Sequence, residues 1–276
     1  MKKLGIIIIF MTIISTVSVN VCGENITLNN IFNKEKAENN SFYINDEWTG
    51  NVRIEGKSET IWSGEITVTD SNINAENASS GLIETYYLPY PSILGTLDEA
   101  SKQGAFSYYV IYYPDWNAFY VQTISEDSDW WHYWVDYELP MVGAGKYELT
   151  DEDNEILWGY LENWEAHALK ITIDKQIVKK YEEFTVSVFN ESDSFVKNAT
   201  VFIGSQPYFT DINGNVTKKL KESGSYVIYS EKNDFVRSEK IILKVKTKSV
   251  SKNILLNYFF KHFKIINIIK NFKNYN

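Results

Sequence analysis

Cysteine is nearly absent from this chain. Its single cysteine, Cys22, lies within the first 23 of the 276 residues. A disulfide framework, a thiolate nucleophile and a cysteine-based metal site are therefore excluded from the rest of the chain. Packing alone must hold the fold, and a hydrophobic content of 44% with 15% aromatics is sufficient for a sizeable core.

Histidine is also scarce, with three in the chain. Zinc-type histidine spacings, phosphate-binding glycine loops and the Gly-x-Ser-x-Gly nucleophile motif do not occur. His132 has two aspartates nearby in sequence but no partner nucleophile. The acidic residues near 127–129 and 151–155 could form a carboxylate pair or a cation site, but a solvated turn is the simpler interpretation. We therefore expect no enzymatic activity, no catalytic residue and no metal site.

Basic residues are rare outside the C-terminal segment. Residues 244–276 carry eight lysines and no acidic residue, and subtracting these eight charges from the formal net charge of −9 leaves −17 for the other 243 residues. A nucleic-acid partner would require a basic surface to neutralise phosphates. The acidic body therefore argues against nucleic-acid binding.

The N-terminus has the pattern of an export signal. Lys2 and Lys3 precede an uncharged apolar run over residues 4–21, and Gly23 supplies a small side chain for cleavage. We predict a signal peptide over residues 1–23, although the run is long enough to remain as an anchor. The polar segment 24–45 then forms a linker, and the protein is expected to be extracellular or at the cell surface.

Residues 46–163 are rich in β-forming side chains. The segments expected to form strands are 59–70, 80–91, 105–113, 118–124, 130–137 and 155–160. Gly64 favours a bend or bulge, and residues 114–117 favour a turn. The periodicity changes over residues 92–104, which predicts one short helix ending at Gly104.

The pattern changes again near residue 164. Residues 164–247 show short alternating segments, for example Phe184, Val186 and Val188, separated by polar turns at residues 213–214 and 223–224. Short strands at this spacing without a helical period predict a β-sandwich.

The tail over residues 248–276 consists almost entirely of Lys, Asn, Ile, Phe and Tyr. Its polar residues recur close to helical spacing, which favours a basic amphipathic helix lying on an anionic membrane surface. A compositionally drifted extension would have the same composition, so both interpretations stay open.

The ring-rich stretch "DWWHYWVDY" over residues 129–137 is the most distinctive segment. On a strand, alternate side chains point to opposite faces. One face would carry four uncharged residues, Trp131, Tyr133, Val135 and Tyr137. The other would carry Trp130, His132, Trp134 and Asp136. The second face suits either the packing of Trp130 and Trp134 against the second domain, or an exposed surface for a planar or sugar-like ligand.

Residues 130–160 carry a resemblance to a known family. The segments Trp131–Val135, Gly143–Ala144, Tyr147–Leu149 and Ile156–Tyr160 follow the pattern of the C-terminal β-domain of transcobalamin and intrinsic factor, and of its prokaryotic relatives of unknown function. The family implies a β-grasp that binds soluble ligands. This chain departs from the pattern at residues 135–137 and 151–153, and it lacks the helical barrel that supplies most of the cobalamin cradle. Corrinoid binding is therefore a hypothesis only.

Residues 209–241 of the second domain, with the turn Asp211-x-Asn213-Gly214, resemble the immunoglobulin-like or carboxypeptidase-regulatory-like sandwiches of prokaryotic surface proteins. The predicted fold is thus mainly β, with a small α+β, β-grasp-like domain over residues 46–163 followed by an all-β immunoglobulin-like sandwich over residues 164–247.

Two functions are compatible with this organisation. The first is an exported binding module for a soluble small molecule or a cell-surface glycan, with no cofactor other than the hypothetical corrinoid. Its ligand-binding residues would be Trp130, His132, Trp134, Asp136 and Trp116. The alternative is a structural or adhesive cell-envelope protein without a small-molecule site. Exposure of the second face around a concavity would favour binding, and its burial would favour the structural alternative.

Overall fold

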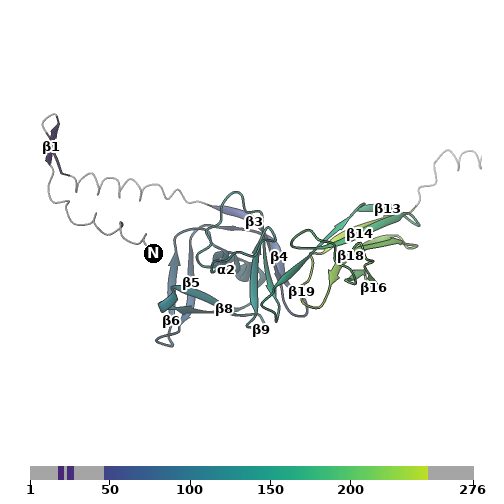
Figure 1. Cartoon of the computed structure of the whole chain (residues 1–276), viewed down its shortest axis with the longest axis horizontal. Helices are drawn as coiled ribbons and strands as arrows, with labels where there is room; N and C mark the ends of the chain where they lie inside the picture. The colour runs from purple at the N-terminus through teal and green to yellow at the C-terminus, as the bar shows by residue number, and fades with distance from the viewer. Residues whose placement is uncertain (1–17, 22–23, 28–46, 248–276) are drawn as a thin grey trace, which may run out of the picture.

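A computed structural model of the protein describes residues 18–21, 24–27 and 47–247. This part of the chain is mainly β, as predicted. Figure 1 shows two bodies side by side, one with the strands β3 to β11 around the helix α2 and one with the strands β12 to β20. We refer to them as the first and the second domain. In the part described, no helix has the length and hydrophobicity of a membrane span.

A separate hairpin pairs β1 (Ser18–Val21) with β2 (Glu24–Thr27). It lies across the predicted boundary between signal peptide and linker. Most of both predicted segments, and the whole predicted tail over residues 248–276, lie outside the described residues.

The first domain contains two sheets. The four-stranded sheet consists, in spatial order, of β10 (Trp131–Val135), β11 (Glu155–Tyr160), β3 (Trp48–Glu55) and β4 (Thr60–Val68). The five-stranded sheet consists of β6 (Ile83–Leu88), β5 (Ser71–Asn77), β7 (Tyr108–Tyr113), β8 (Ala118–Ile124) and β9 (Asp127–Ser128). β3 pairs with β11 and β5 with β7 in parallel, and the other pairs are antiparallel.

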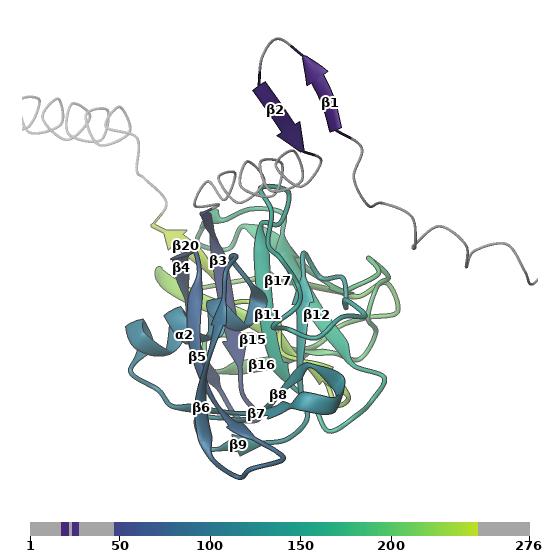
Figure 2. The same ribbon diagram turned by 90° about the vertical axis from the view of Figure 1, so that its left-hand side faces the viewer.

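The predicted helix is present as α2 (Ile93–Gly104). The Ser92 side chain caps its N-terminus by accepting a hydrogen bond from the Gly95 amide at 3.1 Å. Its buried residues Leu94 and Leu97 enter a single core with side chains from both sheets. Figure 2 shows α2 beside β4 and β5. Gly104 ends the helix, but the left-handed residue is Ala105, with φ 52°.

Two local expectations were wrong. Gly64 is regularly paired with Val52, and the irregularity of the β3–β4 ladder lies instead at Ile54 and Glu55. Gly64 is needed because the Trp62 indole lies across it, 2.9 Å from where a Cβ would stand. The strand β5 was missed because its sequence "SNINAEN" is polar, although its inward residues alternate correctly and are buried.

The second domain consists of two sheets packed face to face. One contains β17 (Asn215–Lys219), β14 (Glu183–Asn190), β12 (His167–Ile173) and β19 (Phe235–Val236). The other contains β13 (Ile177–Lys179), β20 (Ile241–Lys246), β18 (Gly224–Glu231), β15 (Thr200–Ile203) and β16 (Gln206–Phe209). Inward residues of both sheets, including Phe184 and Leu243 at 0% exposure, share one core.

Candidate functional site

The ring-rich stretch forms the edge strand β10 of the four-stranded sheet. It pairs antiparallel with β11, with Tyr133 opposite Trp158 and Trp134 opposite Leu157. Tyr133 and Val135 are buried in the core of the first domain, and Trp131 packs partly against it. The predicted alternation of faces is therefore present from residue 131 to residue 135.

Trp134 lies on the opposite face and is fully buried. It shares a small apolar cluster with Leu157 of the first domain and with Ala166, Ala168 and Val236, which lie in and beside β12 and β19. The second domain thus covers this face of the sheet. This outcome corresponds to the packing alternative for Trp134.

A glycine on β11 allows the second domain to approach so closely. A Cβ on Gly159 would stand 2.5 Å from a methyl group of Val236 and 2.9 Å from the Trp134 ring. Both distances are shorter than any relaxed carbon–carbon contact. The lack of a side chain at Gly159 therefore lets the Val236 side chain lie directly on the sheet.

Trp130 and His132 are half-buried at the margin of this contact. Trp130 precedes the strand in a left-handed conformation, and its ring packs on Trp164 with centroids 5.0 Å apart. His132 Nε2 lies 3.2 Å from the carbonyl oxygen of Leu161. Both side chains thus contact the connection between the domains.

Lowering the pH from 7 to 5 is expected to destabilise the fold through His132. Burial lowers the pKa of His132, and the carbonyl groups of Leu161 and Asn163 only partly oppose this shift. The unfolded chain therefore takes up the proton first, at its ordinary pKa of about 6.5. The stabilisation is present above that pH and is lost as the pH falls through the lowered pKa.

The matched variant is His132→Gln, whose amide keeps a hydrogen-bond donor near Leu161. It should flatten the dependence of unfolding free energy on pH between 7 and 5, as measured by urea unfolding at each pH. The same slope in both proteins would refute the assignment to His132.

Asp136 has a structural role in the turn after β10. Asp136 and Tyr137 both have positive φ, 47° and 66°. The Asp136 carboxylate accepts hydrogen bonds from the backbone amides of Asn154 and Glu155, the latter at 2.9 Å. It thereby fixes the start of β11 against the end of β10.

Trp116 lies between two strands of the five-stranded sheet, whereas the other four predicted residues lie on or beside β10 of the four-stranded sheet. It ends the short 3-10 turn Pro114–Trp116 between β7 and β8, and 71% of its surface is exposed. The five predicted ligand-binding residues are thus not brought together. Trp130, His132 and Trp134 lie at the domain junction, Asp136 stabilises the turn after β10, and Trp116 is exposed in the connection between β7 and β8.

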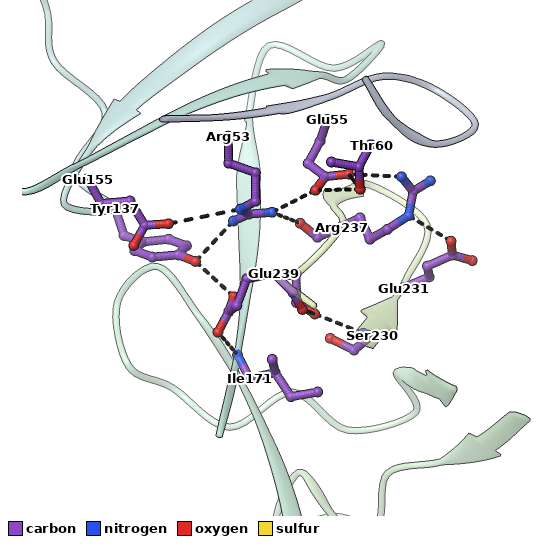
Figure 3. Close-up of polar contacts among 11 residues, drawn as sticks. Arg53, Glu55, Thr60, Tyr137, Glu155, Ile171, Ser230, Glu231, Arg237 and Glu239 are labelled. Atoms are coloured by element: carbon purple, nitrogen blue, oxygen red, sulfur yellow. Dashed lines mark hydrogen bonds and ion pairs between the residues drawn. The ribbon is translucent and has the colours of Figure 1, made fainter. Parts of the chain in front are cut away.

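A buried ionic network lies on the same face of the sheet as Trp134 (Figure 3). Arg53 and Glu55 project from β3 and are 5% and 1% exposed. Arg53 donates to Glu55 at 3.1 Å and to the backbone carbonyl of Arg237 at 2.9 Å. The Arg237 guanidinium donates to Glu55 at 2.9 Å and to Glu231 at 2.8 Å.

Tyr137 extends this network toward β12. Its hydroxyl accepts from Arg53 at 3.0 Å and donates to Glu239 at 2.9 Å. Glu239 also accepts from the backbone amide of Ile171 at 3.1 Å. The network therefore joins β3 and the β10–β11 turn of the first domain to β12 and the β19–β20 connection of the second (Figure 3).

Burial controls the protonation of this network. It raises the pKa of Glu155, a shift that Glu239 and Asp136 reinforce and Arg53 opposes. It also raises the pKa of Tyr137, which therefore remains a neutral donor. Burial alone would lower the pKa of Arg53, but Tyr137 and the surrounding carboxylates more than compensate. Arg53 is thus held as a cation in the junction.

The sequence analysis missed this network because Arg53 and Glu55 alternate with apolar residues on β3. Such alternation normally indicates a solvated outer face. The first half of β3 fits that expectation, because Thr49 and Asn51 are exposed. In the second half the same face is covered by the second domain.

A cleft of about 600 Å³ opens beside the network. Both domains line it, with Lys57 and Tyr160 on one side and Lys232 and Arg237 on the other. Several of its charged groups are already paired, Lys57 with Glu162 at 2.6 Å and Arg237 with Glu55 and Glu231. Small-molecule sites are mostly apolar with a few free polar groups. The lining of this cleft is therefore typical of an interface between two domains and not of a small-molecule site.

The arrangement does not fit a corrinoid at the predicted face. A flat macrocycle would need an open indole surface, and Trp134 is enclosed by the second domain. The Trp134 indole lies among apolar side chains, and its Nε1 atom has no hydrogen-bond partner. Among the described residues, no group of three or more His, Cys, Asp or Glu side chains is arranged to hold a metal ion.

Comparison with known proteins assigns the chain to no family. No protein-family model matches the sequence, and no curated protein matches it.

Proposed function

We propose that this protein is an exported structural or adhesive protein of the cell surface, in which two β domains are held in one fixed orientation. The observation that carries the proposal is the complete burial of Trp134 under the second domain. The face predicted to be a ligand surface is used to join the domains. The buried Arg53 and Glu55 and the largely buried Arg237 side chain support this interpretation, since each has polar partners across the junction.

A fixed junction suits a spacer or adhesive better than a small-molecule receptor that closes around its ligand. Hinged receptors leave the surface between their domains open and solvated. Here that surface consists of an apolar cluster around Trp134 beside a network of paired charges. Interdomain motion would expose both to water.

The proposal includes an ancestry and a location. We infer that the first domain is a β-grasp-like relative of the transcobalamin C-terminal domain, and that the second is an immunoglobulin-like sandwich. The position of α2 and the two facing sheets of the second domain support this inference. Export rests on Lys2, Lys3 and the apolar run that follows them, and the basic tail is a candidate contact with an anionic membrane surface.

A distance measurement across the junction tests the fixed orientation. We would place spin labels at Gln103→Cys and Lys221→Cys, both exposed positions, in a Cys22→Ser background of the full chain. The expected result from pulsed electron paramagnetic resonance is a single narrow distance distribution. Arg237→Ala should broaden it, because the loss of one guanidinium leaves Glu55 incompletely paired across the junction.

The control is Lys57→Ala, which removes an ion pair whose side chains are 60% and 52% exposed. It should leave the distribution unchanged. A broad or bimodal distribution in the background protein would refute the proposal, since it would show that the two domains move independently.

A further inference from the structure

The outward face of the five-stranded sheet carries a row of aromatic side chains. Val110 and the rings of Tyr108 and Tyr112 face the core, so Tyr109, Ile111 and Tyr113 project from the other side of β7. Alternate residues on a strand are about 6.7 Å apart, so these three span roughly 13 Å.

A second row crosses the strands on the same face. Ile83 on β6 is paired with Glu76 on β5, Glu76 with Ile111 on β7, and Ile111 with Tyr120 on β8. Ile83 is 61% exposed and Tyr120 is 39% exposed. The two rows intersect at Ile111, so apolar and aromatic groups lie side by side on this face, with Glu76 between Ile83 and Ile111.

Carboxylates fix two of the phenol rings on this face, those of Tyr109 and Tyr120. The hydroxyl of Tyr109 donates to Glu76, and that of Tyr120 donates to Asp129 at 3.0 Å. Partial burial, together with Asp129, raises the pKa of Tyr120 to about 12, so its hydroxyl remains protonated. Because each ring is already held by a hydrogen bond, binding a ligand would cost little side-chain entropy.

At the end of β7 the face continues into the exposed ring of Trp116, which we call the Trp116 ledge, and into a small cleft. The ring of Trp116 packs near that of Tyr113, with centroids 5.3 Å apart. Both rings line a cleft of about 230 Å³ together with Asp115 and the Ala78–Ser79 turn. The 71% exposure of Trp116 is unusual for so large an apolar group.

Carboxylates outnumber cations on this face. The strands β5, β6, β7, β8 and β9 contain no lysine or arginine, and Glu76, Asp115 and Asp129 lie on or beside the face. One cation, Lys146, donates to the backbone carbonyl of Trp116 at 3.3 Å. The excess of carboxylates disfavours an anionic ligand. Aromatic faces beside carboxylate acceptors suit a ligand with flat C–H surfaces and many hydroxyl donors.

We propose that this face, from Tyr109 and Tyr120 to the Trp116 ledge, binds a neutral polysaccharide. The sugar rings lie on the aromatic rows, their hydroxyl groups donate to Glu76 and Asp115, and the chain ends in the cleft beside Tyr113. This inference deepens the proposed function, because it names the partner class of an adhesive surface. It does not depend on the orientation of the domains, so the distance measurement and the binding test fail independently.

The test uses the full chain and four neutral polysaccharides, namely cellulose, chitin, starch and mannan, with alginate as an anionic and polylysine as a cationic probe. We expect retention on at least one neutral polysaccharide, unchanged between 0.05 and 0.5 M NaCl, and none on alginate. Trp116→Ala should weaken that retention at least tenfold, and so should Tyr120→Ala.

The control is Trp164→Ala, since Trp164 is also highly exposed, at 82%, but lies beside the junction. It should retain full binding, and all three variants should remain folded, with the far-ultraviolet circular dichroism spectrum of the parent chain. Retention on none of the four neutral polysaccharides would overturn the proposal. Salt-sensitive binding to polylysine alone would also overturn it and would point to a basic protein partner.

Discussion

Glu55→Ala is expected to lower the free energy of unfolding by about 3–5 kcal/mol. Glu55 is 1% exposed and accepts hydrogen bonds from Arg53, Arg237 and Thr60. Its removal leaves two guanidinium groups at the junction without their common carboxylate. Such a loss is a large part of the 5–15 kcal/mol that stabilises a typical domain. Urea unfolding followed by tryptophan fluorescence would measure it.

The matched control is Glu162→Ala, which removes the exposed partner of Lys57 close to the same junction. Exposed ion pairs contribute at most about 1 kcal/mol, so this variant should unfold almost as the parent chain does. Equal losses in Glu55→Ala and Glu162→Ala would show that the buried network does not stabilise the junction.

Replacing the buried charges together separates stability from orientation. Apolar substitutes for a buried ion cluster are often neutral or stabilising. The triple variant Arg53→Met, Glu55→Leu and Arg237→Met should therefore recover most of the stability that Glu55→Ala loses. We expect the distance between the domains to be less well defined in this variant, because apolar contacts specify direction less strictly than hydrogen bonds do.

Trp134→Ala is expected to cost about 3–5 kcal/mol and to uncouple the two domains. The indole is fully buried, and side chains from both domains surround it. Scanning calorimetry should show one unfolding transition for the parent chain and two for the variant.

Two comparisons sharpen this second prediction. Trp134→Phe should cost much less than Trp134→Ala, because Nε1 has no hydrogen-bond partner to lose. Trp130→Ala removes a half-buried ring that packs on Trp164, and such a pair contributes about 0.5–1.5 kcal/mol. A single transition in Trp134→Ala would mean that the apolar cluster is dispensable for coupling.

Local patterns in the sequence were sufficient to predict much of the secondary structure. The helix over residues 92–104 was found because the periodicity changes there and Gly104 marks its end, and the strand over residues 155–160 was found from its β-forming side chains. The strand β5 was missed because its outward residues are polar and only Ile73 and Ala75 are apolar. Propensity is weak evidence where one face of a strand faces solvent.

The junction could not be predicted in the same way. Strand parity separated Trp134 from Tyr133 correctly, but it does not say what covers each face. The cover for Trp134 comes from Val236, about a hundred positions further along the chain. Likewise, the sequence alone does not indicate why residue 159 is a glycine. The reason is the close packing of the Val236 side chain on it. The outward aromatic face of the five-stranded sheet was not predicted for a related reason. Its rings come from alternate positions of β7 and from β8, so they form no contiguous sequence motif.

The parallel pairing of β3 with β11 has a consequence for folding. Asn51 is paired with Glu155, so β3 cannot acquire this neighbour until the chain has been synthesised beyond residue 155. Closing so long a loop is slow. Until then the nascent chain can form the β3–β4 hairpin and the other local hairpins, with one edge of β3 unpaired. A chaperone that binds extended segments would find its target at residues 48–55 during that interval, before translation reaches the last strand of the sheet.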